Sequence, residues 1–267
     1  MKFNTKCVHG SGKPDSTGAI SPAIYMSSTF SHPQLGDTTG YQYTRESNPT
    51  RDRLEQLIAG LEEGTDALAF SSGMAAVDAV FHLFSPGDHI ILGDDLYGGS
   101  IRMFTNIYEQ NGIEFTYVGT SDLDAVKAAF KPNTKAVYIE TPTNPMMEIT
   151  DIRALCALAH ERNALVIIDN TFLSPYFQKP LTLGADIVVH SGTKFIGGHH
   201  DVISGFTIVK DDELAAKLRL TYKTVGACLS AMDSWLVIRG VKTLALRMEQ
   251  HQKNAIALAE WLKTQPK

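Results

Sequence analysis

The sequence predicts an α/β fold in which a mainly parallel β-sheet is sandwiched between helices. From Ala67 onward, short apolar runs alternate with amphipathic stretches of helical periodicity. The runs are apolar throughout rather than alternating in polarity, which is typical of parallel strands covered on both faces. With 267 residues, the chain is long enough to bury the core of such a domain.

The elements follow one another in a regular order. The first sixty residues are rich in Ser, Thr, Pro, Gly and Tyr and are expected to form an extended arm that ends in a helix over 51–61. Strands are expected at 67–70, 89–92, 115–118, 136–139, 165–168 and 187–189. Helices are expected at 74–84, about 99–111, 213–222 and 232–263. A ligand site should then lie beyond the carboxyl ends of the strands.

Charge, hydropathy and cysteine content limit the possible partners and location of the protein. The chain has 24 basic and 29 acidic residues and a net charge of −5, spread along its length, which argues against nucleic acid as a partner. No apolar run is long enough to span a membrane, and residues 1–10 lack the apolar stretch of a signal peptide. Cys7, Cys156 and Cys228 form no CxxC pair. These features predict a cytoplasmic protein with no disulfide framework.

Polar residues follow three of the expected strands. Ser71, Ser72 and Gly73 begin a helix on small residues with free backbone N–H groups, which is either an anion site or an ordinary turn. Asp169 follows a buried strand, where its carboxylate can pair with a protonated pyridine nitrogen, cap a helix or bind a metal.

Lys194 comes soon after the strand at 187–189, close to the hydroxyl residues Ser191 and Thr193. Most lysines are solvated surface charges, but one that is desolvated at this position has a lowered pKa and can form a Schiff base. The adjacent histidines His199 and His200 cannot easily share one ion, so no metal is expected.

Several segments together resemble one known family, the cystathionine γ-synthase, β-lyase and γ-lyase group of pyridoxal-phosphate (PLP) enzymes. The similarity spans nearly the whole chain. The matching motifs occur in the family's order, at 41–45 (YQYTR), 48–50 (NPT), 70–75 (FSSGMA), 95–99 (DLYGG), 140–145 (ETPTNP), 169–172 (DNTF) and 191–194 (SGTK). The resemblance implies the large domain of the aspartate aminotransferase-like PLP-dependent transferases.

The resemblance also implies roles for individual residues. Lys194 would bind PLP covalently and transfer protons, Asp169 would hold the pyridine nitrogen, and Tyr97 would stack on the ring and help to abstract a proton. The other expected cofactor contacts are to the phosphate from Gly73, Met74, Ser191 and Thr193, and to the ring oxygen from Asn144. Tyr43 and Arg45 would reach the cofactor phosphate of a neighbouring subunit, in a dimer of dimers with shared active sites.

The same resemblance implies three regions in the chain, and it assigns no residue here to binding the substrate carboxylate. Residues 1–60 would contact the neighbouring subunit, 61–250 would form the PLP-binding domain, and 251–267 would begin a linker to a further domain. This chain does not contain that α+β domain, which carries the arginine that clamps the substrate carboxylate in the family.

The expected activity is C–S elimination from cystathionine, by a β- or γ-lyase. Two alternatives remain: γ-replacement, as in cystathionine γ-synthases and O-acylhomoserine thiol-lyases, and a non-catalytic PLP-binding fragment. Gly99 stands where methionine γ-lyases carry a cysteine, which argues against that member of the family. A dinucleotide-dependent oxidoreductase is disfavoured, because no GxGxxG motif follows the first strand.

Overall fold

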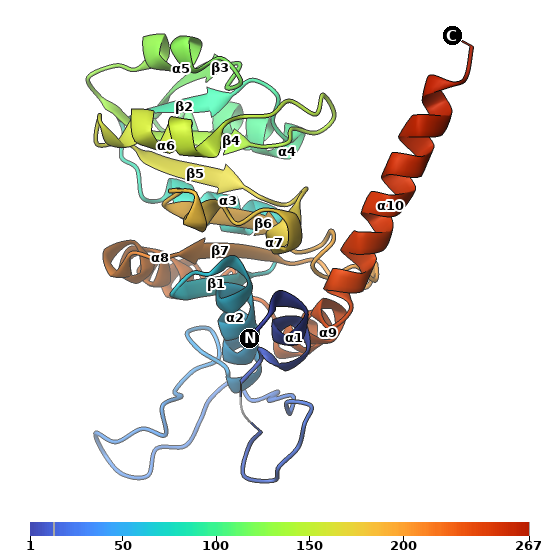
Figure 1. Ribbon diagram of the computed structural model, residues 1–267. Helices are drawn as coiled ribbons and strands as arrows, with labels where there is room; N and C mark the ends of the chain where they lie inside the picture. Colours follow the sequence, from blue (N-terminus) through green and yellow to red (C-terminus); the bar gives the residue numbers. More distant parts are fainter. Residues whose placement is uncertain (13, 267) are drawn as a thin grey trace.

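A seven-stranded sheet forms the centre of the computed structural model, which describes residues 1–12 and 14–266 (Figure 1). The strand order is β1-β7-β6-β5-β4-β2-β3. The strands are β1 (Asp66–Phe70), β2 (His89–Gly93), β3 (Glu114–Val118), β4 (Thr134–Glu140), β5 (Leu165–Asp169), β6 (Ile187–Ser191) and β7 (Gly205–Val209). All neighbouring pairs are parallel except the two that involve β7. The expected mainly parallel sheet is therefore confirmed.

Helices cover both faces of this sheet. They are α1 (Phe3–His9), α2 (Pro49–Glu62), α3 (Gly73–Phe81), α4 (Gly98–Met103), α5 (Leu123–Ala129), α6 (Ile152–His160), α7 (Ser174–Phe177), α8 (Asp212–Val225), α9 (Ala231–Val241) and α10 (Leu244–Lys263). A π-helical turn, η1 (Phe104–Tyr108), extends α4, and a short 3-10 helix, η2 (Pro180–Thr182), precedes β6.

Side chains that alternate along each strand divide the core into layers. On β5, Ile167 packs in the cluster that includes α3, η1 and α8. Val166 and Ile168, on the opposite face, pack with α5 and α6. A third cluster joins α2, α9 and the start of α10 to β1, β6 and β7. Because successive strand residues point to opposite faces, continuous apolar runs are what this three-layer arrangement requires.

Strand β7 was not anticipated, and it is the one that runs against the others. It follows the loop after Lys194 and pairs with β6 on one side and β1 on the other. Its sequence is a short apolar run like those of the other strands. An apolar pattern indicates a buried strand but not whether that strand runs parallel or antiparallel to its neighbours.

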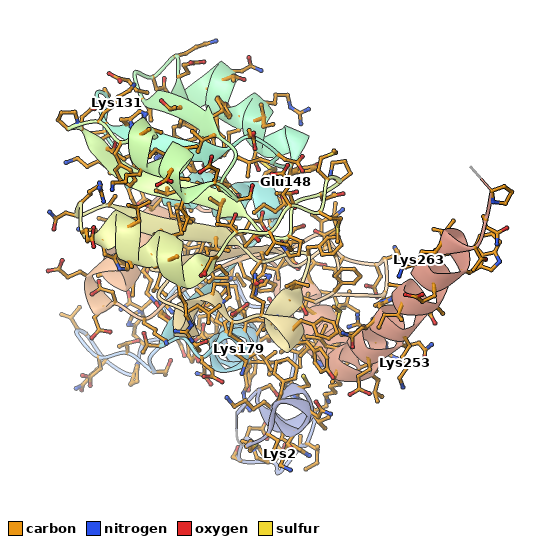
Figure 2. All side chains as sticks on the ribbon, turned by 45° about the horizontal axis from the view of Figure 1, so that its top comes forward. Lys2, Lys131, Glu148, Lys179, Lys253 and Lys263 are labelled. Atoms are coloured by element: carbon orange, nitrogen blue, oxygen red, sulfur yellow. The ribbon has the colours of Figure 1, made fainter. Side chains whose placement is uncertain are left out.

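The expected single helix over 232–263 is wrong, because it is divided into α9 and α10 by Lys242 and Thr243. Val241 and Leu244 are both buried on either side of the break, so the apolar periodicity continues across it and conceals it. Beyond its buried start, α10 extends away from the sheet, and Lys253 and Lys263 lie along this projecting part (Figures 1 and 2).

The expected N-terminal arm includes a helix, α1, before its extended part. Residues 14–48 run as a long loop that lies below the sheet in Figure 1. Several hydrogen bonds attach this loop to the domain. Among them, Trp235 Nε1 donates to the Pro22 carbonyl at 3.1 Å, and Thr50 Oγ1 donates to the Ala23 carbonyl at 3.0 Å. Within the described residues, no helix is long and apolar enough to cross a lipid bilayer.

Candidate active site

A cavity of about 1080 Å³ lies at the carboxyl ends of β4, β5 and β6, where the sequence placed the ligand site. The final residues of these strands, Glu140, Asp169 and Ser191, all line it. The cavity brings together eight of the ten expected site residues: Gly73, Met74, Tyr97, Asn144, Asp169, Ser191, Thr193 and Lys194.

One wall of the cavity is the first turn of α3. The Ser72 hydroxyl caps this helix by accepting a hydrogen bond from the Ala75 N–H at 3.1 Å. The N–H groups of Gly73 and Met74 donate to no group in the described part of the chain, so they remain available to an anion. A Cβ on Gly73 would lie 2.8 Å from the Ser191 Cβ, so only glycine lets these two turns approach so closely.

Gly205 supports the same wall from β7. A Cβ at this position would overlap the carbonyl oxygen of Ser72 and lie 2.7 Å from the Cα of Gly73, and both are backbone atoms with little freedom to move. We therefore expect Gly205→Ala to lower the free energy of unfolding by about 2 kcal/mol or more, measured by denaturant titration. Gly60→Ala is the matched control, because Gly60 lies within α2 with open space around it. The control should leave stability unchanged or raise it by up to about 1 kcal/mol, and equal effects of the two changes would contradict the packing argument.

Ser191 and Thr193 follow one another along the edge of the cavity. The Ser191 N–H donates to Thr171 Oγ1 at 2.8 Å, which fixes the end of β6 against the end of β5. The Thr193 hydroxyl donates to the Ser204 carbonyl at 3.2 Å and accepts from the Ser204 N–H at 3.1 Å. Both residues line the cavity, and Ser204, directly before β7, sets the orientation of Thr193.

Asp169 lines the cavity and is only partly exposed. Its Oδ1 accepts hydrogen bonds from the Thr171 N–H at 3.0 Å and the Thr171 hydroxyl at 2.6 Å. Burial raises the pKa of Asp169, and the two bonds from Thr171 oppose that rise by stabilising the carboxylate. A cationic partner in the cavity would favour the ionised form further.

Lys194 lines the cavity, but the expectation that it is desolvated is wrong for this chain. Its side chain is exposed, in the loop that follows β6. Its Nζ makes no hydrogen bond or ion pair within the described residues, whereas Lys131, Lys179 and Lys263 are all paired with glutamates. The amine is therefore available to a ligand in the cavity.

Tyr97 and Asn144 line the cavity from the two neighbouring loops. Tyr97 is 53% exposed, and its N–H donates to Glu140 Oε2 at 3.2 Å. The ring lies over Gly99, where a Cβ would overlap it. Asn144 is exposed and lies in a loop that is shaped by cis peptide bonds before Pro142 and Pro145. Both side chains have room to contact a ligand.

Tyr43 and Arg45 do not line this cavity. The Arg45 guanidinium lies 5.3 Å from the centroid of the Tyr43 ring and donates a hydrogen bond to the carbonyl of Lys223, at the end of α8. Tyr43 is 43% exposed. Their place on the arm means that neither residue contributes to the site of its own chain in this structure.

The cavity also contains residues that were not selected from the sequence. They include Glu140, Phe172, Phe195, His200, Arg247 and His251. Arg247 extends from α10 and donates to the carbonyl of Phe195 at 2.5 Å and to that of Gly240 at 3.0 Å, which holds the loop after Lys194 in place. Glu140 had a recognisable signal, because it ends an apolar strand in the same way as Asp169.

This arrangement fits pyridoxal phosphate. The N–H groups at the start of α3, which have no acceptor among the described residues, suit its phosphate. The half-buried Asp169 suits its ring nitrogen, and the Lys194 amine, unpaired in the same part of the chain, suits its aldehyde. The close approach of Gly73 to Ser191 places the anion-binding turn directly beside the end of β6.

Comparison with known proteins agrees with the geometry. The chain is 49% identical to a cystathionine γ-lyase of Bacillus subtilis, over 100% of this chain and 70% of that protein. It is 50% identical to a cystathionine β-lyase of Lactococcus lactis, over 98% of this chain and 69% of the relative, and cystathionine γ-synthases match as well. The crystal structure of cystathionine γ-lyase from Lactobacillus plantarum, complexed with L-serine, superimposes with a TM-score of 0.97 at 50% identity, covering 100% of this chain and 70% of that one.

The family described as Cys/Met metabolism PLP-dependent enzyme matches residues 4–267. A match over that length, together with the cavity at the carboxyl edge of the sheet, leads to one conclusion: the chain belongs to the PLP-dependent enzymes of Cys/Met metabolism.

Proposed function

We propose that this chain acts on sulfur amino acids and breaks the C–S bond of cystathionine, as a β- or γ-lyase. The observation that carries the proposal is the meeting of Lys194, Asp169 and the first turn of α3 in one cavity. Similarity to a cystathionine γ-lyase and a cystathionine β-lyase supports cystathionine as the substrate. When bound, PLP supplies an electron sink that stabilises negative charge at the α-carbon of an amino acid.

In this proposal Lys194 has two tasks. Its unpaired amine holds the cofactor covalently, and after an amino-acid substrate has taken its place the same amine moves the proton at the α-carbon. The exposed position of the side chain favours both tasks, because the amine breaks no internal bond when it moves.

The remaining residues orient and hold the group. Asp169 keeps the ring nitrogen protonated, the N–H groups of Gly73 and Met74 bind the phosphate, and Tyr97 stacks on the ring. The proposal assigns further cofactor contacts to Ser191, Thr193 and Asn144. Support for these roles comes from the lining of one cavity by all of these residues.

We propose a shared site as well. Tyr43 and Arg45 lie outside the cavity of their own chain, on an arm that projects from the domain (Figure 1). An arginine can form a bidentate contact with a phosphate, so Arg45 suits the cofactor phosphate of a neighbouring subunit. This arrangement makes the working unit at least a homodimer, and a dimer of dimers in the full assembly.

The division of the chain into an arm over 1–60, a PLP-binding domain over 61–250 and the start of a linker over 251–267 is part of the same proposal. It is supported by the loop over residues 14–48 and by the projection of α10 beyond the sheet. We also propose a cytoplasmic location, for which the free cysteines Cys7, Cys156 and Cys228 give support.

γ-Replacement on an activated homoserine is the second candidate, and the similarity to cystathionine γ-synthases favours it. The two activities separate in one assay. Cystathionine supplied alone should yield a thiol, a keto acid and ammonia if the chain is a lyase, whereas consumption of O-acylhomoserine only together with a thiol would favour γ-replacement. A chain that binds PLP and turns over neither substrate would be a non-catalytic binding protein.

Asp169→Ala should keep some bound PLP and lose most turnover. The phosphate contacts at α3 remain in this variant, but the carboxylate that holds the ring nitrogen protonated is gone. Removal of a preorganised electrostatic partner typically costs on the order of a hundredfold in turnover. Cystathionine turnover and visible absorbance of the same samples measure the two effects separately. If turnover were unchanged, the partner of the ring nitrogen would have to be another residue.

A further inference from the structure

A second carboxyl group shares the base of the cavity with Asp169. Glu140 ends β4, Asp169 ends β5, and the two residues are directly paired in the parallel ladder. Paired residues of neighbouring strands present their side chains on the same face of the sheet. Both side chains line the cavity, and Glu140 is only 7% exposed. A buried acid at this position has no role among those assigned above.

Glu140 is bonded to the backbone of Tyr97. Its Oε2 accepts the hydrogen bond from the Tyr97 N–H at 3.2 Å, which attaches the start of α4 to the end of β4. The Tyr97 carbonyl bonds only within its own helix turn, to the N–H groups of Ser100 and Ile101. Gly98 and Gly99 follow immediately and supply no side chains, so the bond to Glu140 is the contact that joins the Tyr97 backbone to the end of β4.

The charges around Glu140 are mostly negative. The carboxylates of Asp169, on β5, and Asp95, in the loop before α4, both repel a negative charge on Glu140. The uncharged Tyr138 hydroxyl lies on β4 with Glu140, and Lys194 lines the same cavity. Burial, followed by repulsion from Asp169, raises the pKa of Glu140 to about 8. Asp169 has two donors from Thr171 that favour its ionised form. The Tyr97 N–H favours the ionised form of Glu140 in the same way, but the net shift in the pKa of Glu140 is still upward because burial is the larger effect.

We propose that Glu140 is a positioning residue: its neutral carboxyl group holds the backbone of Tyr97 so that the ring stays over the cavity, and it leaves Asp169 as the charged member of the pair. The inference rests on the proposed role of Tyr97 in binding the cofactor. Glu140 touches neither cofactor nor substrate in this role and acts through Tyr97.

The contact with Tyr97 is tested by titrating PLP into the cofactor-free chain and following the visible circular dichroism of the bound ring. Glu140→Leu fills a similar volume without the acceptor, and it should weaken PLP binding about tenfold and change the dichroism. Glu140→Gln keeps an acceptor oxygen and should bind PLP as wild type does at pH 7. Tyr97→Ala should weaken binding, and adding Glu140→Leu to it should have no further effect, because the two residues act as one unit.

These outcomes separate the inference from the proposed function. If Tyr97→Ala weakens binding but Glu140→Leu does not, Glu140 has no positioning role and the role of Tyr97 stands. If the effects of Tyr97→Ala and Glu140→Leu simply add, Glu140 acts by another route and the inference is overturned. If Tyr97→Ala leaves binding unchanged, the proposed role of Tyr97 is wrong and the inference fails with it.

Thermal unfolding of the PLP-loaded chain tests the protonation state and remains informative if Glu140→Leu does not fold. A folded pKa of about 8, above the ordinary value of 4.5, means that the folded chain binds more protons between these pH values. Wild-type stability should therefore fall as the pH rises through this window, and Glu140→Gln removes that loss. The melting temperature of Glu140→Gln relative to wild type should rise from about pH 5 to about pH 8.

Glu161→Gln is the matched control, because its side chain is 74% exposed at the end of α6. The difference between this control and wild type should stay constant over the same pH range. A constant difference for Glu140→Gln as well would mean that Glu140 is ionised throughout, and the neutral-acid part of the inference would be overturned.

Discussion

Replacing Lys194 with alanine should abolish covalent capture of PLP and lower cystathionine turnover by on the order of a thousandfold or more. Both effects follow from the loss of one amine, which holds the cofactor and moves the proton at the α-carbon. Wild-type protein should be yellow, and borohydride should convert its carbon–nitrogen double bond to PLP into a stable amine. Peptide mapping of the reduced protein should then find the label on Lys194, and the Lys194→Ala protein should carry none.

Lys131→Ala provides the matched control. Lys131 is paired with Glu114 and lies at the opposite end of the domain from α10 (Figure 2). Its removal should leave both labelling and turnover unchanged. A label on any lysine other than Lys194, or the absence of any label from wild-type protein, would overturn the assignment of the cofactor site.

The sequence predicted those site residues that lie where a strand of the sheet ends or a helix begins directly after one. Asp169 and Ser191 end neighbouring parallel strands, and Gly73 begins the helix that follows β1, so their meeting at one edge follows from the fold class alone. Glu140 has the same kind of position but was overlooked, because its motif was interpreted only through Asn144. A systematic inspection of every strand end would have found it.

The direction of β7, the break between α9 and α10 and the exposure of Lys194 depend on tertiary contacts, which a local sequence pattern does not reveal. The orientation of β7 is decided by pairing with both β6 and β1, and the break at Thr243 lies between two buried apolar residues. Exposure of Lys194 depends on the direction of the loop after β6, which Arg247 holds through the carbonyl of Phe195. The sequence supplied the chemical identity of these groups but not the direction in which the chain carries them.

Mixing the Arg45→Ala and Lys194→Ala variants should restore intact sites if the arm completes the site of a neighbour. Arg45→Ala alone should weaken PLP binding, and Lys194→Ala alone should lose covalent capture. In a hybrid dimer, the Arg45→Ala chain supplies Lys194 and the Lys194→Ala chain supplies Arg45, so one of the two sites has both native residues and the other has neither. Random exchange at equal concentrations makes about a quarter of all sites intact.

The measured quantities are PLP affinity and borohydride labelling of Lys194, which do not require turnover. Labelling at a PLP concentration too low to fill the Arg45→Ala sites should reappear in the mixture, because the intact sites have their phosphate contact again. Each variant mixed with itself and treated identically is the control, and a pull-down with one tagged chain establishes that subunits have exchanged. The structure motivates the experiment, since Arg45 hydrogen-bonds to the carbonyl of Lys223 and lies outside the cavity of its own chain. If hybrids form but labelling does not exceed that of the separate variants, Arg45 does not act across a subunit boundary, and the shared-site proposal is wrong.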